Sequence, residues 1–330
     1  MGKLGTWTNN EARQFEILPL ENNPLEIEYT QLETRFDSEE GISWVLMNPK
    51  DVPCFNLDIL GELQQYNQSI EDCGGKIWKR GESHAIRYMV FASRTPGVFN
   101  LGGQLALFIR LIRNADRQAL MHYATMCIYS MASRIRHYDL PVVTISLVQG
   151  DALGGGFEAA LTSDIIIAER NSRMGFPEIL FNLFPGMGAY SFLARKIGTV
   201  QAEKIILSGK LYSAEELHAL GLVDVLVEDG EGEEAVYDFV AKQARRSNGY
   251  IAMRKARKMF NPVTYQELMD ITGIWVDAAL QLNEKDLKVM DRFLRSQQKL
   301  FGNSARVQHS AEAVQKAAET RRKPEMALVL

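Results

Sequence analysis

Residues 146–188 decide the fold of this chain, and they read SLVQGDALGGGFEAALTSDIIIAERNSRMGFPEILFNLFPGMG. An apolar run, Val142 to Val148, leads into the stretch and predicts a buried strand. A helical pattern starts at the three glycines and carries Glu158. The β-branched run Asp164 to Ala168 predicts a second buried strand, and the loop after it presents Glu178.

The glycine run, Gly154 to Gly156, allows the backbone to approach a ligand closely. At the start of a helix its N–H groups have no intrahelical partner, and such donors stabilise a developing oxyanion. Glu158 and Glu178 would serve as acid and base beside this hole, because burial in an apolar stretch raises the pKa of a carboxyl group. Each feature alone is more often a tight turn or a solvated glutamate, so the hypothesis rests on their combination.

A second, upstream copy of this pattern supports the hypothesis. The order apolar strand, loop, Leu-Gly-Gly, helix occurs over residues 86–105 and again over 142–158. Gly154 lies 52 positions after Gly102, which leaves room for a crossover helix. We therefore expect two parallel strands to deliver two glycine turns to one edge of a sheet, each with one oxyanion donor.

The composition limits the class of protein. The 330 residues are 46% hydrophobic and 24% charged, as in a globular protein with a sizeable core. The net charge of −4 argues against nucleic acid as a partner. Three cysteines without Cys-x-x-Cys spacing favour a reducing compartment. With no apolar signal region and no run of about 18 apolar residues, we expect a cytoplasmic protein without a membrane span.

Four parts are expected along the chain. Residues 1–24 form an N-terminal extension and 25–245 a catalytic core. Residues 246–301 form a helical module that covers the site or a subunit interface, and 302–330 a charged tail that is a loose helix or disordered. Strands are expected at 26–36, 42–48, 86–92 and 222–227, and helices at 55–70, 105–117, 120–136, 190–197, 201–208, 213–220 and 236–246.

Other chemistry finds little support. The five histidines lack metal-ligand spacing, and there is no G-x-S-x-G or P-loop motif, so no metal is predicted. The basic positions among residues 245–258 would suit a phosphate-bearing substrate arm or an acidic carrier protein, although a solvated helix face is the ordinary explanation.

Taken in order, these motifs resemble the crotonase (enoyl-CoA hydratase/isomerase) superfamily, whose pattern is G-x-A-x-G-G-G-x-E, D-x-x-x-A, x-P-E and P-G-x-G. The likeness covers roughly residues 40–245, and it implies an α/β fold with a crotonase-like ββα spiral core and a C-terminal helical module. The matching segments here are Gly150–Glu158, Asp164–Ala168, Phe176–Glu178 and Pro185–Gly188, with Phe99–Gln104 as the other oxyanion turn.

The resemblance implies roles for particular residues. The backbone N–H groups of Leu101 and Gly155 would be the oxyanion donors, with Gly102 beside them against the substrate. Glu158 and Glu178 match both acidic positions of the hydratases, whereas many relatives keep only one. This implies addition or removal of water, with Glu178 taking the α-proton and Glu158 protonating the departing hydroxyl.

An acyl substrate also requires an apolar pocket. Met187, nine residues after Glu178, and Trp275 are the candidates for its wall, although a core position is the ordinary explanation for Trp275. Gln104 stands where the family often has Asp, so any role of that carboxylate is lost here.

The N-terminal extension, the long helical segment over residues 103–136 and the sequence FNLFPGMGAYS look most like the diffusible signal factor synthases. These enzymes dehydrate a 3-hydroxyacyl thioester on the phosphopantetheine of acyl carrier protein and cleave the thioester, which releases a cis-2-unsaturated fatty acid for bacterial quorum sensing. The resemblance implies the same activity here, without metal or redox cofactor, in a homotrimer that docks to a restraining signal receptor. A 2-enoyl-CoA hydratase of fatty acid metabolism and a crotonase-fold scaffold or partner-binding subunit are the alternatives.

Overall fold

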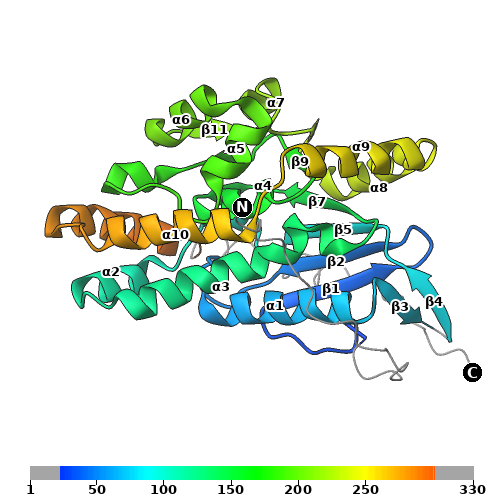
Figure 1. The fold of residues 1–330 in the computed structure, drawn as a ribbon, viewed down its shortest axis with the longest axis horizontal. Coiled ribbons are helices and arrows are strands. Elements are labelled where there is room, and N and C mark those ends of the chain that lie inside the picture. The colour runs from blue at the N-terminus through cyan, green and yellow to red at the C-terminus, as the bar shows by residue number, and fades with distance from the viewer. Residues whose placement is uncertain (1–22, 80, 300, 302–330) are drawn as a thin grey trace, which may run out of the picture.

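The computed structural model describes residues 23–79, 81–299 and 301 (Figure 1). The predictions for most of the N-terminal extension and for the charged tail lie outside these residues.

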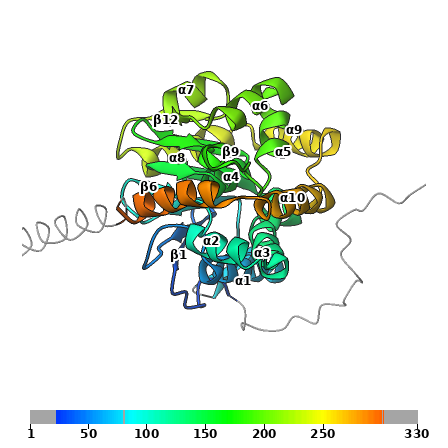
Figure 2. The same ribbon diagram turned by 90° about the vertical axis from the view of Figure 1, so that its left-hand side faces the viewer.

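A six-stranded sheet forms the centre of the molecule, in the order β1-β2-β5-β7-β9-β12. Only the β1–β2 pair is antiparallel, and the other neighbours are parallel. Helices cover both faces of the sheet (Figures 1 and 2), which explains why its inner strands β2, β5, β7 and β9 are largely apolar and buried. The strands are Leu32–Asp37, Ile42–Met47, Tyr88–Ser93, Val143–Val148, Ile165–Glu169 and Val225–Val227.

A smaller sheet, in the order β11-β10-β8-β6, carries the turns that the sequence singles out. Strands β6, β8 and β10 each follow a strand of the large sheet directly, so the chain repeats a strand–strand–helix unit as the predicted spiral requires. These strands have only three residues each and were not predicted, nor was the hairpin β3–β4. Their bounds are Val98–Asn100, Asp151–Leu153, Arg173–Gly175 and Leu211–Ser213, and the hairpin strands are Lys76–Lys79 and Glu82–Ala85.

The helices pack in two groups around the sheets. One buried cluster joins one face of the large sheet to α8, and a larger cluster joins the other face to α1, α3 and the C-terminal helices. The helices are α1 Leu57–Asp72, α2 Leu105–Arg113, α3 Arg117–Ile135, α4 Gly155–Leu161, α5 Ala189–Ile197, α6 Thr199–Ser208, α7 Ala214–Ala219, α8 Gly232–Ala244, α9 Ser247–Phe260 and α10 Tyr265–Ala279, with short 3-10 helices η1 His137–Asp139 and η2 Pro177–Phe181 and a last helix over 284–299.

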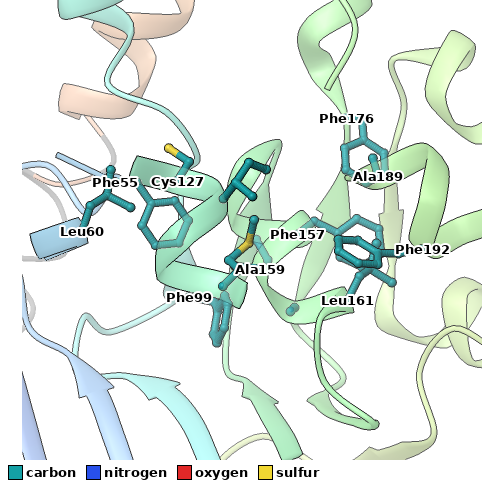
Figure 3. Packing of buried hydrophobic residues seen from close by; sticks show 14 of the residues in the cluster. Phe55, Leu60, Phe99, Cys127, Phe157, Ala159, Leu161, Phe176, Ala189 and Phe192 are labelled. Atoms are coloured by element: carbon teal, nitrogen blue, oxygen red, sulfur yellow. The ribbon is translucent and has the colours of Figure 1, made fainter. Parts of the chain in front are cut away.

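Aromatic packing holds α4 in place inside the larger cluster. The ring of Phe157 stacks on that of Phe176 with centroids 5.1 Å apart, and Ala159 and Leu161 lie in the same cluster (Figure 3). Glu158 follows Phe157 directly in α4, so this packing also fixes the position of Glu158.

Three predictions about element boundaries were wrong. The strand expected from residue 26 begins at Leu32, because the N–H groups of Thr30 and Gln31 donate to Glu62 and not to a neighbouring strand. The helix expected from residue 236 begins earlier, at Gly232. The expected helix to residue 117 stops at Arg113. The helix expected over residues 213–220 begins with a capping box formed by Ser213 and Glu216.

Candidate active site

The two glycine turns meet at one edge of the small sheet, as predicted. Strands β6 and β8 pair in parallel, and the turn after each leads into a helix. Gly102 has φ +91°, and a Cβ there would lie 2.7 Å from the carbonyl oxygen of Leu153 and 3.1 Å from the nitrogen of Gly155. Only a glycine permits this approach, so the contact between the turns depends on Gly102.

A cavity of about 300 Å³ opens beside this contact. Every residue that the sequence singles out for the site lies on its wall, namely Leu101, Gly102, Gly155, Glu158, Glu178, Met187 and Trp275. The structure therefore brings together residues that are up to 174 positions apart in the sequence. Its volume is at the lower end of the range for small-molecule pockets.

Glu158 is 1% exposed and is held by the loop that precedes α5. Its Oε1 accepts hydrogen bonds from the N–H groups of Met187 (2.7 Å) and Ala189 (2.9 Å). Burial raises the pKa of Glu158 to about 7, and the N–H groups oppose the rise. A carboxyl group with this pKa gives or takes a proton near neutral pH.

Glu178 faces the glycine turn from η2. A Cβ on Gly154 would lie 2.2 Å from its Oε1, so the carboxylate rests directly on the backbone of this glycine. Its Oε2 is buried and accepts no hydrogen bond from the described residues. Burial and the charge of Glu158 raise the pKa of Glu178 to about 8. Both carboxyl groups with raised pKa thus lie on the wall of one cavity, and the charge of Glu158 acts on Glu178.

The prediction that Leu101 supplies a free oxyanion donor is wrong, because its N–H donates to the carbonyl oxygen of Pro53 at 2.7 Å. The neighbouring N–H groups of Gly102 and Gln104 donate to the side chains of Asn100 and Tyr123. Of the four N–H groups in the turn 101–104, only that of Gly103 has no acceptor among the described residues. Gly103 also lies on the cavity wall, so we assign the first donor to Gly103.

The N–H of Gly155 has the environment expected of the second donor. Gly155 is the first residue of α4, and its N–H has no acceptor within the described chain. A Cβ on Gly155 would lie 2.8 Å from the sulfur of Met187, so Met187 lies directly beside this donor.

The deeper part of the cavity wall is apolar. Trp275 of α10 packs against Gly186, and its ring meets that of Phe108 edge-on with centroids 5.2 Å apart. The sequence did not single out the wall residues that α2 and α3 contribute, since their spacing is that of ordinary core positions. These residues are Leu105, Phe108, Tyr123, Ala124 and Cys127.

One charged pair on the wall was also not predicted. Asp151, which is buried, receives two hydrogen bonds from the guanidinium of Arg173, at 3.0 Å and 2.7 Å. The basic stretch of α9 is divided, because Arg254 is buried in an ion pair with Asp164 while Lys255 and Arg257 are exposed.

The described residues contain no group of three or more His, Cys, Asp or Glu side chains that could hold a metal ion. In the same part of the chain, none of the helices combines the length and the apolar character needed to cross a bilayer.

Comparison with known proteins identifies the class to which this fold and site belong. Residues 46–303 match the family model described as enoyl-CoA hydratase/isomerase. The chain therefore belongs to that family, which confirms the expected fold class.

Individual relatives agree with this placement. Methylglutaconyl-CoA hydratase, mitochondrial, of Rattus norvegicus is 31% identical over 201 residues, which are 59% of this chain and 59% of the relative. The chain thus spans about three fifths of the first curated relatives. The structure of Pseudomonas aeruginosa DspI matches with TM-score 0.55 and 25% identity, over 69% of this chain and 86% of DspI. A putative enoyl-CoA hydratase from Streptomyces avermitilis matches in fold, with TM-score 0.63 and 20% identity, over 83% of this chain and 92% of its own.

Proposed function

We propose that this protein removes water from a 3-hydroxyacyl thioester on acyl carrier protein and then hydrolyses the thioester, releasing a cis-2-unsaturated fatty acid that serves as a quorum-sensing signal. The observation that carries the proposal is a pair of carboxyl groups with raised pKa, on one cavity with two backbone N–H groups that have no acceptor among the described residues. The motif resemblance to the diffusible signal factor synthases supports the finer assignment.

The thioester carbonyl binds between the N–H groups of Gly103 and Gly155. Negative charge develops on its oxygen when the α-proton leaves, and each donor contributes about 3 kcal/mol of stabilisation at that point. The same donors hold the oxyanion of a tetrahedral intermediate, so one hole serves both steps.

The glutamate pair moves the protons of dehydration. Glu178 takes the α-proton, the C–H electron pair becomes the new double bond, and the C–O bond breaks as Glu158 gives its proton to the hydroxyl, which leaves as water. This division requires one proton on the pair, carried by Glu158. The raised pKa of both groups allows a single proton near neutral pH, and the form with that proton on Glu158 is the less populated of the two.

Dehydration leaves Glu158 ionised, so it can act as the base in the hydrolysis step. This carboxylate takes a proton from a water molecule, whose oxygen bonds to the thioester carbon. The C–S bond breaks as the tetrahedral intermediate collapses, and the departing sulfur takes the proton that Glu178 received during dehydration, which returns both glutamates to their starting states. The acyl chain lies against Met187 and Trp275 in the apolar part of the cavity.

A 2-enoyl-CoA hydratase is the second candidate, and the names of the curated relatives favour it. Its substrate would be a CoA thioester, and its reaction would be reversible addition of water without release of free acid. The homotrimer, the receptor partner and the cytoplasmic location rest on the resemblance and the composition alone.

Mass spectrometry of products separates the candidates. The purified protein is incubated with 3-hydroxydodecanoyl thioester, on acyl carrier protein and on CoA. The expected product is free cis-2-dodecenoic acid. Its rate of formation should fall about 10²- to 10⁴-fold in Glu158→Gln and Glu178→Gln. The exposed Glu234 supplies the control, since Glu234→Gln should act like wild type. Reversible hydration of trans-2-dodecenoyl-CoA without free acid would replace the proposal with the hydratase.

A further inference from the structure

The last described helix, residues 284–299, contacts both halves of the candidate site. Buried Leu287 and Met290 anchor it in the core. This last helix (orange in Figures 1 and 2) lies beside α2. Its Glu284 forms an ion pair with Arg113 of α2 at 3.1 Å. Its Phe293 meets Phe181 edge-on, with centroids 5.6 Å apart.

The contact of Phe293 reaches the half of the site that carries the base. Phe181 is the last residue of η2, the short helix that also holds Glu178. Phe293 and Gln297 both lie on the cavity wall, one turn apart on the same helix. The helix therefore spans from the Glu178 side to the oxyanion side.

Gln297 makes the contact on the oxyanion side. Its side chain is buried, at 8% exposure, and its Nε2 donates to the carbonyl oxygen of Leu101 at 2.8 Å. The turn 101–104 is otherwise held by Pro53, Phe55, Asn100 and Tyr123, all of which precede the glutamate-bearing elements in the chain. Gln297 thus connects the C-terminal part of the protein to this turn.

We infer that Gln297 is a positioning residue for the oxyanion hole, an inference that rests on the proposed function. The peptide plane after Leu101 directly precedes Gly102 and Gly103, which have no side chains to restrict them. The hydrogen bond from Gln297 fixes the plane that contains the Leu101 carbonyl and the Gly102 N–H. The N–H of Gly103 lies in the following plane, whose carbonyl accepts a hydrogen bond from the N–H of Phe55. Gln297 therefore acts on the direction of the Gly103 N–H through the flexible backbone of Gly102. A small misplacement of such a donor reduces turnover strongly.

An amide suits this task because it donates without adding charge. A cation at this position would favour the ionised form of the nearby glutamate pair and lower its pKa, which would remove the acid. An ionised glutamate has only acceptor oxygens, so it could not donate to the carbonyl of Leu101, which would lose this hydrogen bond.

Kinetics and hydrogen exchange of three variants test the inference. Gln297→Leu removes the donor, Gln297→Glu keeps the shape, and Gln298→Leu makes the first change at the adjacent exposed position. With 3-hydroxydodecanoyl-CoA, the expected kcat falls about 10- to 100-fold in both Gln297 variants, with KM within about twofold of wild type. Gln298→Leu should retain both constants.

Amide hydrogen exchange in the free protein gives a readout that needs no turnover. Exchange of the segment 99–104 should become faster in both Gln297 variants and stay unchanged in Gln298→Leu. Unchanged exchange, or a Gln297→Leu enzyme with wild-type kcat, would overturn the inference. Faster exchange in a protein that turns over no thioester would instead refute the proposed function and leave the ordering role of Gln297 supported. If one Gln297 variant does not fold, the other decides.

Discussion

The carboxylates of Glu158 and Glu178 differ in their partners although both are buried on one cavity. Glu158 receives two backbone N–H groups, whereas Oε2 of Glu178 receives no hydrogen bond from the described residues. The unpartnered group has the higher pKa, about 8 against about 7, and is the stronger base when ionised. This order places a single shared proton mainly on Glu178, so Glu178 takes the α-proton from the less populated form in which Glu158 holds that proton.

The rate of dehydration should follow a bell-shaped pH profile. Below a pH of about 7 both carboxyl groups are protonated and the base is lost, and above about 8 both are ionised and the acid is lost. We expect maximal kcat between these values, measured with one thioester from pH 5 to 10. A flat profile across pH 6 to 9 would contradict the shared proton.

The stability of the protein should depend on Glu178 in the opposite direction from an ordinary ion-paired carboxylate. Its folded-state pKa is raised, so the folded state binds more protons than the unfolded state and stability falls as pH rises from about 4.5 to about 8. Glu178→Gln removes the buried charge. At pH 9 its free energy of unfolding in urea should therefore exceed that of wild type by about 1 to 3 kcal/mol. At pH 5 the two should be nearly equal, and an equal gap at both pH values would refute this account.

Gly154 should tolerate no side chain. Its φ is +52°, and a Cβ would lie 2.2 Å from Oε1 of Glu178, so Gly154→Ala must move the base. We expect kcat to fall about 100-fold. Gly249→Ala is the matched control, because nothing lies within 4 Å of the added carbon. Wild-type kcat in Gly154→Ala would show that Glu178 does not need its observed position.

At the scale of elements, short segments carry the chemistry and long helices shape the pocket. The turns after β6 and β8 present the N–H donors, and α4 and η2 present the glutamates. Helix α3 adds Tyr123, Ala124 and Cys127 to the apolar wall from one face. The catalytic and specificity-determining parts are thus on different elements.

Filling the pocket from α3 should therefore change the preferred substrate and spare the chemistry. Ala124→Phe places a ring in the apolar part of the cavity and should shift the highest kcat/KM to acyl chains shorter by several carbons. The effect per methylene is about 1–3 kcal/mol, or 10- to 200-fold in kcat/KM. His122→Phe, at an exposed position on the same helix, should leave the chain-length profile unchanged. An unaltered profile in Ala124→Phe would show that the acyl chain binds elsewhere.

At the scale of the whole molecule, contacts between distant segments attach the C-terminal helices to the core around the site. Helix α10 packs against α3, and the guanidinium of Arg195 on α5 makes two 2.7 Å bonds to the carboxylate of Glu267 on α10. Arg195 also donates to the carbonyl oxygens of Asn261 and Pro262 in the α9–α10 connection. The C-terminal helices are therefore joined to the core beside the loop that holds Glu158.

Removing this junction should weaken the fold measurably. Arg195→Met keeps much of the side-chain volume but breaks a partly buried bidentate pair, and we expect a loss of about 1 to 3 kcal/mol in the free energy of unfolding by urea. Arg292→Met, at an exposed position without such a network, is the control. Equal stability of the two variants would show that the junction contributes little.

The sequence by itself determined the strands and the chemistry that local patterns encode. The runs at Val142 and Asp164 become neighbouring parallel strands, the glycine turns meet, and Glu158 and Glu178 share a cavity, because apolar periodicity and glycine spacing are local properties. Three-residue strands carry too little periodicity to be recognised.

Only the tertiary structure decided which groups are free to act. The N–H of Leu101 is occupied by Pro53, 48 positions away, and the carbonyl of the same residue by Gln297, 196 positions away. Spacing in a motif shows which residues form a turn, but the partners of each N–H come from distant segments. The oxyanion donor is therefore assigned to Gly103 and not to Leu101. The apolar wall on α3 and the helix over 284–299 lie at the site only because the chain folds there.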